Sequence, residues 1–388
     1  MRISFRRIAG FLLVGLLIEL AFFAGIVFGP RLTGVLAGRS ESEHAPLLNE
    51  AWGIAESEFY GQVPTAQART YGAVRGMMES FNDPYTSFFE PPQTELQSQQ
   101  LSGKFGGIGA SVRREADGRV VLSPFSDQPA AKAGVQEGDV LISIDGTSIT
   151  PDMKFEKVTA LLRGEVGTPV KIEIARGGQK LAFNITRAEI SVPSVTWRIL
   201  SQAPDVGYVK LNIFAQTSKD EVIEAITALK KQGAKKLIFD LRDNGGGLLD
   251  AAVGVASQFV AGTVVSEKDR SKQRDFTAEA SGAARDMPLV VLVNGGTASA
   301  SEIVSGAIQD KGRGVLVGVK TYGKGSVQDV IPLSDGSSLH VTIAEWLTPQ
   351  GRQITGKGLQ PDVVVELTND DVANGRDPQL DRALTAFR

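Results

Sequence analysis

The C-terminal half of the chain alternates short apolar runs with amphipathic segments, a pattern typical of strands and helices in turn. Residues 219–232 place Val222, Ile226 and Leu229 on one helical face, and Gly233 follows as a stop signal. Further helices are expected at 248–260 and 299–309, and strands at 206–211, 236–241, 289–293 and 315–319. Because strands that alternate with helices are joined by right-handed crossovers, this half of the chain predicts a layered α/β core.

The middle of the chain has short strands instead. Residues 138–146 partly alternate apolar and polar side chains and end in an Asp-Gly turn. Residues 171–175 and 181–185 read as a hairpin joined through two glycines, and 155–162 reads as a helix. Residues 99–190 therefore predict a separate, mainly β domain.

Helical periodicity dominates the segment before this domain. Apolar residues recur at helical spacing over 47–59, and a second helix is expected over 66–81, ending at Asn82-Asp83-Pro84. Pro91-Pro92 then begins a polar helix rich in glutamine. Residues 39–98 are thus expected to form an N-terminal helical region.

The N-terminus has the pattern of a membrane segment. Arg2, Arg6 and Arg7 precede residues 8–28, a 21-residue apolar run that holds one charge, Glu19. As a helix this run covers roughly 31 Å, the thickness of a bilayer core. We therefore expect a retained single-pass anchor with the arginines in the cytoplasm. A signal peptide that is cleaved, releasing the protein, is the alternative.

Composition removes several kinds of chemistry. The chain has no cysteine, which excludes disulfides, thiol catalysis and cysteine metal sites. Its only histidines are His44, expected to be solvated, and His340, expected in a strand, so a histidine base has few candidates and zinc is disfavoured. A net charge of −3 gives no sign of nucleic-acid binding. No cofactor and no metal are expected.

The strongest chemical pattern joins a serine to a lysine. Ser299 stands at an expected strand-to-helix turn, Lys324 follows 25 residues later, and Gln328 follows four residues after that. At a helix N-terminus the Ala300 N–H can stabilise an oxyanion, and burial can lower the pKa of a lysine enough for it to act as a base. The amide of Gln328 can orient the amine. The plainer interpretation is that Ser299 only caps a helix, since Ser299 and Glu302 fit a capping box.

A glycine-rich segment follows another expected strand. Asp240 to Gly247 ends in three consecutive glycines, which allow close backbone approach to a ligand and positive φ angles. An ordinary turn and a phosphate-binding loop are the alternatives. The segment lacks the spacing of dinucleotide-binding and Walker loops, which disfavours phosphate.

Taken together, these segments resemble the C-terminal processing (tail-specific) peptidases. The resemblance covers roughly residues 45–388 and is carried by four blocks at 240–249, 297–303, 323–328 and 348–362. Asp83-Pro84-Tyr85-Thr86-Ser87 and Asp377-Pro378-Gln379-Leu380 resemble the family's terminal signatures. Each block is weak alone, but the combination is specific.

The resemblance implies a serine endopeptidase with a crotonase/ClpP-like α/β core that cuts proteins near their C-termini. It implies Ser299 as nucleophile, Lys324 as general base and Gln328 as the residue that positions the lysine. Gly246 and Ala300 match the oxyanion donors, although many members have proline where Gly245 stands. Ser301 is the rival nucleophile, and Glu302 is interpreted as a helix cap.

Residues 99–190 resemble a PDZ domain. Gly106, Gly107, Ile108 and Gly109 match the loop that binds a peptide's terminal carboxylate, with the extended peptide adding along a strand edge. Arg163, in a glycine-bounded turn, is our candidate for coupling the PDZ domain to the protease core. The expected partners are protein or peptide C-termini, with dimerisation through the N- or C-terminal segments, or an adaptor protein, as further partners.

The expected organisation is an anchor (1–38), a helical region (39–98), a PDZ domain (99–190), a Ser–Lys protease core (191–368) and a tail (369–388). The resemblance and the anchor together imply a bacterial inner-membrane protein with a periplasmic catalytic domain. Three rivals are kept: an inactive PDZ scaffold, an acyl-CoA enzyme of the crotonase type, and a Ser–His arrangement through His340.

Overall fold

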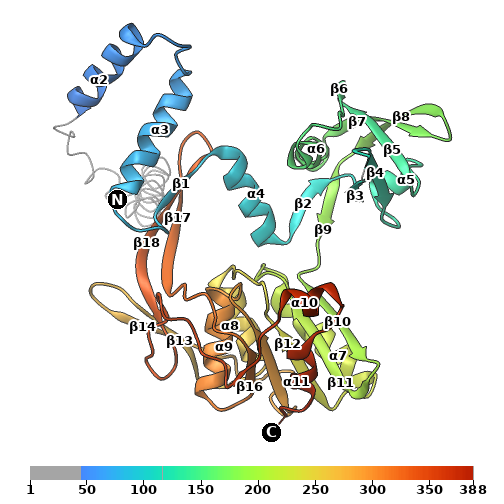
Figure 1. Cartoon of the computed structure of the whole chain (residues 1–388), viewed down its shortest axis with the longest axis vertical. Coiled ribbons are helices and arrows are strands. Elements are labelled where there is room, and N and C mark those ends of the chain that lie inside the picture. Colours follow the sequence, from blue (N-terminus) through green and yellow to red (C-terminus); the bar gives the residue numbers. More distant parts are fainter. Residues whose placement is uncertain (1–44, 116, 388) are drawn as a thin grey trace, which may run out of the picture. The chain divides into compact units, whose positions relative to one another are not determined.

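A computed structural model describes residues 45–115 and 117–387. The chain divides into two compact units, with the boundary between Gly72 and Ala73 (Figure 1). The expected membrane segment at 8–28 lies outside the described residues. Within those residues, no helix has both the length and the apolar character needed to cross a bilayer.

The first unit contains helix α2 (Ala45–Glu58) and the beginning of α3 (Ala66–Glu79), close to the expected bounds. Thr65 caps α3 by accepting a hydrogen bond from the N–H of Ala68 at 3.2 Å. An ion pair between Arg69 and Glu56 joins the two helices. The side chains of Leu47 and Ile54 are exposed, so the helices leave apolar surface open.

The second unit is built on a central sheet with the strand order β10-β11-β12-β15-β16-β19. Strands β11 to β19 are parallel, and β10 is antiparallel to β11. The bounds are β10 Val195–Leu200, β11 Ala203–Leu211, β12 Lys236–Asp240, β15 Leu289–Val293, β16 Val315–Gly318 and β19 Val363–Val364. The strands agree with the expected α/β alternation, because parallel neighbours need crossover helices between them.

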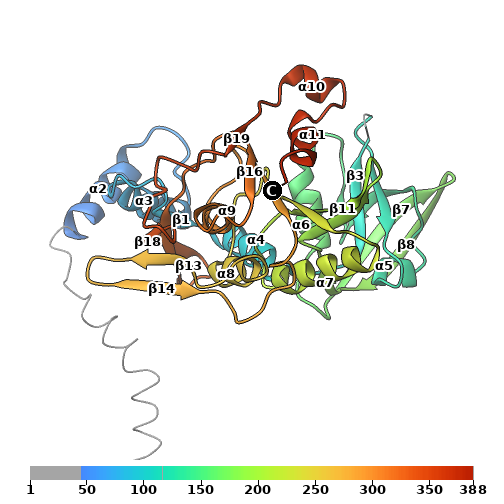
Figure 2. The same ribbon diagram turned by 90° about the horizontal axis from the view of Figure 1, so that it is seen from below.

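Helices cover both faces of this sheet. Helices α7 (Ser218–Lys231), α8 (Leu249–Ser257) and α9 (Ala300–Asp310) contribute to one apolar core, and α11 (Pro378–Leu384) to another. Figure 2 shows α7 and α8 on one side of the strands and α11 on the other. The short helix α10 (Asn369–Ala373) precedes α11. Strands covered on both faces should be apolar throughout, and all five residues of β15 are buried.

A second sheet carries residues from distant parts of the chain in the order β1-β18-β13-β14, and β17 also pairs with β18. The bounds are β1 Ser87–Phe89, β13 Thr263–Lys268, β14 Gln273–Thr277, β17 Ser326–Pro332 and β18 Ser338–Leu347. Ser87 lies opposite His340, so the expectation that His340 occupies a strand is confirmed. Strand β1 comes from before residue 99, yet it pairs with β18, which comes after Lys324 in the sequence.

Residues 108–186, within the segment expected to resemble a PDZ domain, have a core of their own. Their sheet runs β3-β4-β5-β7-β8 with β6 beside β5, and it packs against α5 and α6. The bounds are β3 Ala110–Arg114, β4 Val120–Pro124, α5 Pro129–Lys132, β5 Asp139–Ile144, β6 Thr147–Ser148, α6 Phe155–Leu162, β7 Pro169–Arg176 and β8 Gln179–Thr186. Helix α4 (Pro91–Ser102) and the ribbon of β2 (Lys104–Gly107) with β9 (Ala188–Ser191) connect these residues to the rest of the chain.

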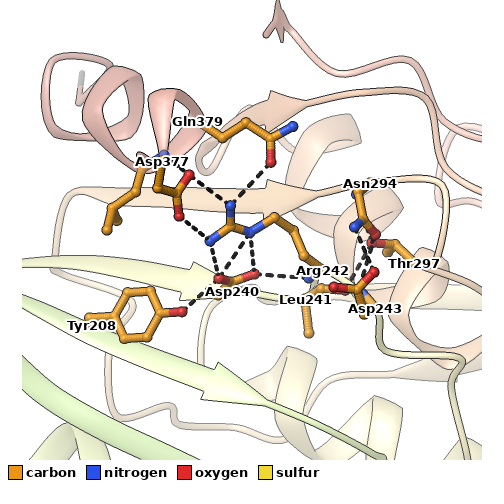
Figure 3. A network of polar contacts seen from close by, with 10 residues as sticks. Tyr208, Asp240, Leu241, Arg242, Asp243, Asn294, Thr297, Asp377 and Gln379 are labelled. Atoms are coloured by element: carbon orange, nitrogen blue, oxygen red, sulfur yellow. Dashed lines mark hydrogen bonds and ion pairs between the residues drawn. The ribbon is translucent and has the colours of Figure 1, made fainter. Parts of the chain in front are cut away.

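A buried ion network fastens the C-terminal helix to the end of β12 (Figure 3). The guanidinium of Arg242 donates to Asp240 at 2.7 Å and to Asp377 at 2.9 Å, and Tyr208 donates its hydroxyl to Asp240 at 2.7 Å. Gln379 accepts a further bond from Arg242 at 3.1 Å. Asp240 is fully buried, so its charge depends on these donors for compensation.

The network gives the fold a dependence on acid. Burial opposes ionisation of Asp377, but the hydrogen bonds from Arg242 and from the Leu380 N–H outweigh it and lower its pKa. A carboxyl whose pKa is lowered by folding adds stability above its unfolded value of about 4, and this is lost as pH falls through the folded value. We expect Asp377→Asn to cost about 1–2 kcal/mol of unfolding free energy at pH 7.

Urea unfolding of wild type and Asp377→Asn between pH 7 and pH 2 measures this effect. The gap between the two proteins should close below about pH 4, where the wild-type carboxyl gains its proton. Asp381→Asn, on the same helix, is the control for a carboxylate outside the network. A gap that stays constant with pH would assign the loss to packing.

Candidate active site

Three loops that leave adjacent parallel strands meet at one cavity. The glycine-rich segment follows β12, Ser299 follows β15, and Lys324 lies in the loop that follows β16. The carboxyl ends of parallel strands share one edge of the sheet, which is where α/β proteins bind ligands. The cavity measures about 570 Å³, and its lining includes Gly245, Gly246, Ser299, Ala300, Lys324, Gln328 and His340.

Ser299 has a strained backbone at the N-terminus of α9. Its φ of 55° and ψ of −117° lie in a region that residues with side chains rarely occupy, at a cost of order 1–3 kcal/mol. This backbone conformation turns the chain sharply from strand to helix and places the serine on the wall of the cavity. A residue that served only as a helix cap would normally have extended angles.

The glycine loop is packed directly against this turn. Gly246 has a φ of 108°, and a Cβ on it would lie 2.8 Å from the Ser299 Cβ and 3.0 Å from the Ala300 nitrogen. Only glycine fits here, for reasons of both conformation and space. In this conformation the Gly246 N–H donates to Oδ1 of Asn244 at 2.9 Å.

Asn244 joins the loops behind the cavity. It is fully buried and donates its amide to the Leu211 carbonyl at 2.8 Å. The backbone carbonyl of Asn244 accepts from the Ala298 N–H at 3.0 Å and from the Ser301 hydroxyl at 2.9 Å. The rival nucleophile Ser301 is thus buried and bonded to the backbone, whereas Ser299 lines the cavity.

Lys324 is half-buried, and its ammonium lies over the ring of Tyr85, 5.1 Å from the ring centroid. Burial lowers the pKa of Lys324, and the negative charge of Asp83 partly opposes that shift. A lysine with a lowered pKa has more free amine at neutral pH. Among the described residues, no hydrogen bond joins the Lys324 amine to Ser299 or to Gln328.

Gln328 lies in β17, but Lys324 precedes that strand, so the two residues do not share a strand face as alternation would require. The side-chain amide of Gln328 donates to Ser326 Oγ at 2.7 Å and to Thr342 Oγ1 at 3.1 Å. These bonds hold Gln328 in the cavity wall and leave its carbonyl oxygen as the atom that can accept from an amine.

Glu302 joins the serine helix to the lysine loop. Its fully buried carboxylate accepts from the N–H groups of Ser299 at 2.9 Å, Lys324 at 2.8 Å and Gly323 at 2.8 Å. The Thr321 hydroxyl adds a fourth bond at 2.5 Å. The capping role expected from the sequence is present, but the same carboxylate also fixes the backbone of Lys324 relative to that of Ser299.

His340 lies on the same cavity wall and stacks on Phe89 with ring centroids 4.2 Å apart. Its Nε2 is buried and has no hydrogen-bond partner within residues 45–115 and 117–387. Burial and the nearby Lys324 charge both lower its pKa, so it is neutral at pH 7. In the part of the chain that the structure describes, no hydrogen bond joins the His340 side chain to Ser299.

The PDZ segment has a smaller cavity of about 160 Å³. Gly107, Ile108 and Gly109 line it, and so does Arg163. Gly106 packs so closely that a Cβ would lie 1.9 Å from the Gly164 carbonyl oxygen. The Arg163 guanidinium lies 4.4 Å from the Phe105 ring centroid and 3.5 Å from Oε1 of Gln99, on α4; burial lowers its pKa.

Comparison with known proteins identifies the family. The model of Peptidase family S41 matches residues 205–365, and that of the PDZ domain matches 106–186. The carboxy-terminal-processing protease of Bartonella bacilliformis is 38% identical over 331 residues, covering 83% of this chain and 75% of that protein. The chain belongs to the S41 family of carboxy-terminal-processing proteases. The family resemblance expected from the sequence is confirmed.

Other members of the S41 family show how much of the chain is shared. The carboxyl-terminal-processing protease of Synechocystis is 35% identical, over 87% of this chain and 81% of that protein. The chain spans 66% of the length of the Staphylococcus haemolyticus relative, named "Probable CtpA-like serine protease", at 36% identity.

Solved structures are also similar. A Bacteroides fragilis S41 protein shares the fold, with a TM-score of 0.50, 18% identity and coverage of 84% of this chain and 92% of that one. The photosystem II D1 C-terminal processing protease is 34% identical, with a TM-score of 0.48 and coverage of 81% and 86%.

Sequence reasoning missed three site residues. Asn244 sits beside the glycines, and its role depends on loops that are more than 30 residues away. Glu302 was interpreted only as a cap, because Lys324 is distant in sequence. Tyr85 belongs to a signature that the sequence analysis noted, but the pairing of β1 with β18 was needed to place it.

Proposed function

We propose that this chain is a PDZ-regulated serine endopeptidase that cleaves protein substrates near their C-termini through Ser299 and Lys324. The observation that carries the proposal is the single cavity lined by Ser299, Lys324 and the glycine loop at the carboxyl ends of neighbouring strands. The homologues' names supply the substrate class, protein C-termini. The burial of Lys324 supplies the reason why a lysine can serve as the base.

In the proposed reaction the neutral Lys324 amine takes the proton of the Ser299 hydroxyl as the oxygen attacks the scissile carbonyl. The tetrahedral intermediate collapses, the protonated lysine gives its proton to the departing amine, and an acyl-enzyme on Ser299 remains. Water, deprotonated by the same amine, then attacks the acyl carbonyl. The bond to the Ser299 oxygen breaks, the lysine returns the proton to that oxygen, and the new C-terminus is released. Gln328 would hold the amine through its free carbonyl oxygen.

The oxyanion would be stabilised at the N-terminus of α9. Ala300 opens that helix, where backbone N–H groups lack intrahelical acceptors and the helix dipole is positive. Gly246 lies beside the Ala300 nitrogen. It would add a second donor once its N–H turns from Asn244 into the cavity, which glycine allows at low cost.

The PDZ domain would select substrates by their ends. Strand β3 is an edge strand, so an extended peptide can pair with it. The N–H groups at Gly106, Gly107, Ile108 and Gly109 would hold the terminal carboxylate beside the small cavity. This arrangement would deliver the C-terminal region of a chain to the protease and favour cleavage there.

Helix α4 is the proposed route from peptide to active site. Arg163 lines the peptide cavity and contacts Gln99 of α4, while Gln97, Gln100 and Leu101 of the same helix line the catalytic cavity. We expect Arg163→Ala to reduce the stimulation of proteolysis by a C-terminal peptide about threefold to tenfold, because the cation–π and hydrogen-bond contacts are lost.

Peptide-stimulated and basal rates of the two proteins, with peptide affinity from calorimetry, measure this coupling. Arg119→Ala, which removes an exposed arginine of the same domain outside β3 and the peptide cavity, is the control. Full stimulation in Arg163→Ala at saturating peptide would remove the coupling role. If stimulation is weak at low peptide concentration but complete at saturating peptide, because the affinity for peptide has fallen, Arg163 acts in binding alone.

We also propose the inner membrane as the location, with residues 8–28 as anchor and the catalytic domain on the periplasmic side; release after signal cleavage is the alternative. The proposal is motivated by the apolar run at 8–28, by the arginines that precede it, and by the family resemblance. Fractionation of cells, with N-terminal sequencing of the mature protein, separates the two. We also propose that the protein dimerises and binds an adaptor protein.

The function itself is tested with the full-length protein and an unfolded protein substrate. Mass spectrometry of the products should show cuts near the C-terminus, and a fluorophosphonate probe should label Ser299. Blocking the substrate's C-terminus by amidation should slow cleavage. A protein that binds C-terminal peptides but neither cleaves substrate nor reacts with the probe would be the PDZ scaffold instead.

A further inference from the structure

The side chain of Lys324 contacts Tyr85, a residue that is far from it in the sequence. Its ammonium lies 5.1 Å from the centroid of the Tyr85 ring, within the range of a cation–π contact. Tyr322, two residues before the lysine, also lies near the Tyr85 hydroxyl and helps to raise the pKa of that hydroxyl. Tyr85 thus contacts the lysine and lies beside the loop that carries it.

The segment that carries Tyr85 is fixed in place. Asp83 accepts from the Tyr85 N–H at 3.2 Å and from the Thr86 hydroxyl at 2.7 Å. That hydroxyl in turn accepts from the Thr342 N–H of β18 at 3.2 Å. Immediately afterwards β1 pairs with β18. The ring is therefore held by the sheet and does not belong to a free loop.

We propose that Tyr85 is a positioning residue that holds the protonated side chain of Lys324 in a resting seat, from which the amine must move to reach Ser299. The inference rests on the proposed function, since it concerns the same base. It also accounts for the contacts of Lys324, which touches an aromatic face while no hydrogen bond joins its amine to Ser299 or Gln328 among the described residues.

The charges around the amine act in opposite directions. An aromatic face and the Asp83 carboxylate favour the ammonium, whereas burial favours the free amine. Burial opposes ionisation of Asp83, but hydrogen bonds from Thr342 and Thr86 outweigh it and lower its pKa, so that it carries its charge at neutral pH. His340 faces the lysine as a neutral ring. Glu302 and Tyr322 flank the Tyr85 side, where burial and the nearby Tyr322 raise the pKa of Tyr85.

If the Tyr85 ring holds the protonated lysine, removing the ring should make Lys324 more reactive. We expect Tyr85→Leu to lower the pKa of Lys324, because the ammonium loses a favourable contact while burial remains. The rate at which a fluorophosphonate labels Ser299 at pH 7 should then rise about threefold to tenfold, as a cation–π contact of ordinary strength implies. Tyr85→Phe keeps the aromatic face and should leave the lysine titration close to that of wild type.

The titration can be measured without any catalysis. In full-length Ser299→Ala protein with ¹³C-labelled lysine, the ε-carbon resonance of Lys324, assigned with Lys324→Arg, is followed against pH. Tyr85→Leu should move its midpoint to lower pH. Pentafluorophenylalanine at position 85 should do the same, because it keeps the ring's size and removes the negative face. An unmoved midpoint in both variants would overturn the proposal.

The two ideas fail separately. If wild type neither labels nor cleaves while the midpoint moves as expected, the seat stands and the protease assignment fails. If wild type is active but neither the midpoint nor the pH profile of labelling moves, Tyr85 only supports the fold. Should Tyr85→Leu fail to fold, as judged by near-UV circular dichroism, the pentafluorophenylalanine variant decides alone.

Discussion

Lys324→Ala and Ser299→Ala are each expected to reduce kcat/KM for an unfolded protein substrate by about 10⁴-fold or more. The serine supplies the bond to the acyl group, and the lysine is the described cavity residue best placed to remove its proton. Because the two act as one unit, the double variant should be no worse than either single one. Steady-state cleavage and fluorophosphonate labelling of all four proteins measure this.

Matched controls come from the same elements. Ser305→Ala removes a buried hydroxyl from α9 that has no hydrogen-bond partner among the described residues, and Lys320→Ala removes an exposed amine from the lysine loop. Both should keep near wild-type rates. Substantial cleavage by Lys324→Ala would refute the lysine as base and return attention to His340.

The dependence of the cleavage rate on pH is a second test of Ser299 and Lys324 as nucleophile and base. Catalysis needs the free amine, so kcat/KM should rise with pH through the titration of Lys324. Burial lowers the pKa of Lys324, so this rise should be centred below the ordinary lysine value of about 10.4. In Lys324→Ala the residual rate should lose that limb.

Glu302→Ala is expected to cost about 3–5 kcal/mol of unfolding free energy and to suppress labelling of Ser299. The change leaves three backbone N–H groups and one hydroxyl without their common acceptor in a fully buried site. The links between the serine turn and the lysine loop are lost together. Urea unfolding and the labelling rate of the folded fraction separate stability from positioning.

Glu302→Gln is the sharper variant, since it keeps the shape of the side chain. One carboxylate oxygen becomes an NH₂ group, which cannot accept from the two donors that it would face. We expect a smaller loss of stability, about 2–3 kcal/mol, with a clear loss of labelling. Normal labelling in folded Glu302→Gln would reduce Glu302 to the helix cap that the sequence suggested.

Local patterns predicted most of the fold because they depend on short-range chemistry. The 3.6-residue period over 219–232 predicted α7, and the apolar run at 289–293 predicted β15. The layered core followed from their alternation. The spacing of Ser299 and Lys324 in the sequence pointed to them as a pair, and resemblance identified the family.

Contacts between distant segments could not be read in this way. Glu302 and Asn244 look like a cap and a turn residue until the loops they join are placed together. Tyr85 reaches Lys324 only because β1 pairs with β18, and three-residue strands leave almost no periodicity. Pairing across the chain, which a single sequence does not display, decides each of these cases.

Strand β1 means that the catalytic fold is discontinuous in the sequence. Any fragment that begins at the PDZ domain, or at the central sheet, would lack an edge of the second sheet and the aromatic face beneath the lysine. The PDZ domain is thus inserted between two stretches of sequence that contribute strands to the same sheet. Because the PDZ domain is joined to the rest of the chain at both of its ends, through β2 before it and β9 after it, its movement is more restricted than that of a domain linked at one end only.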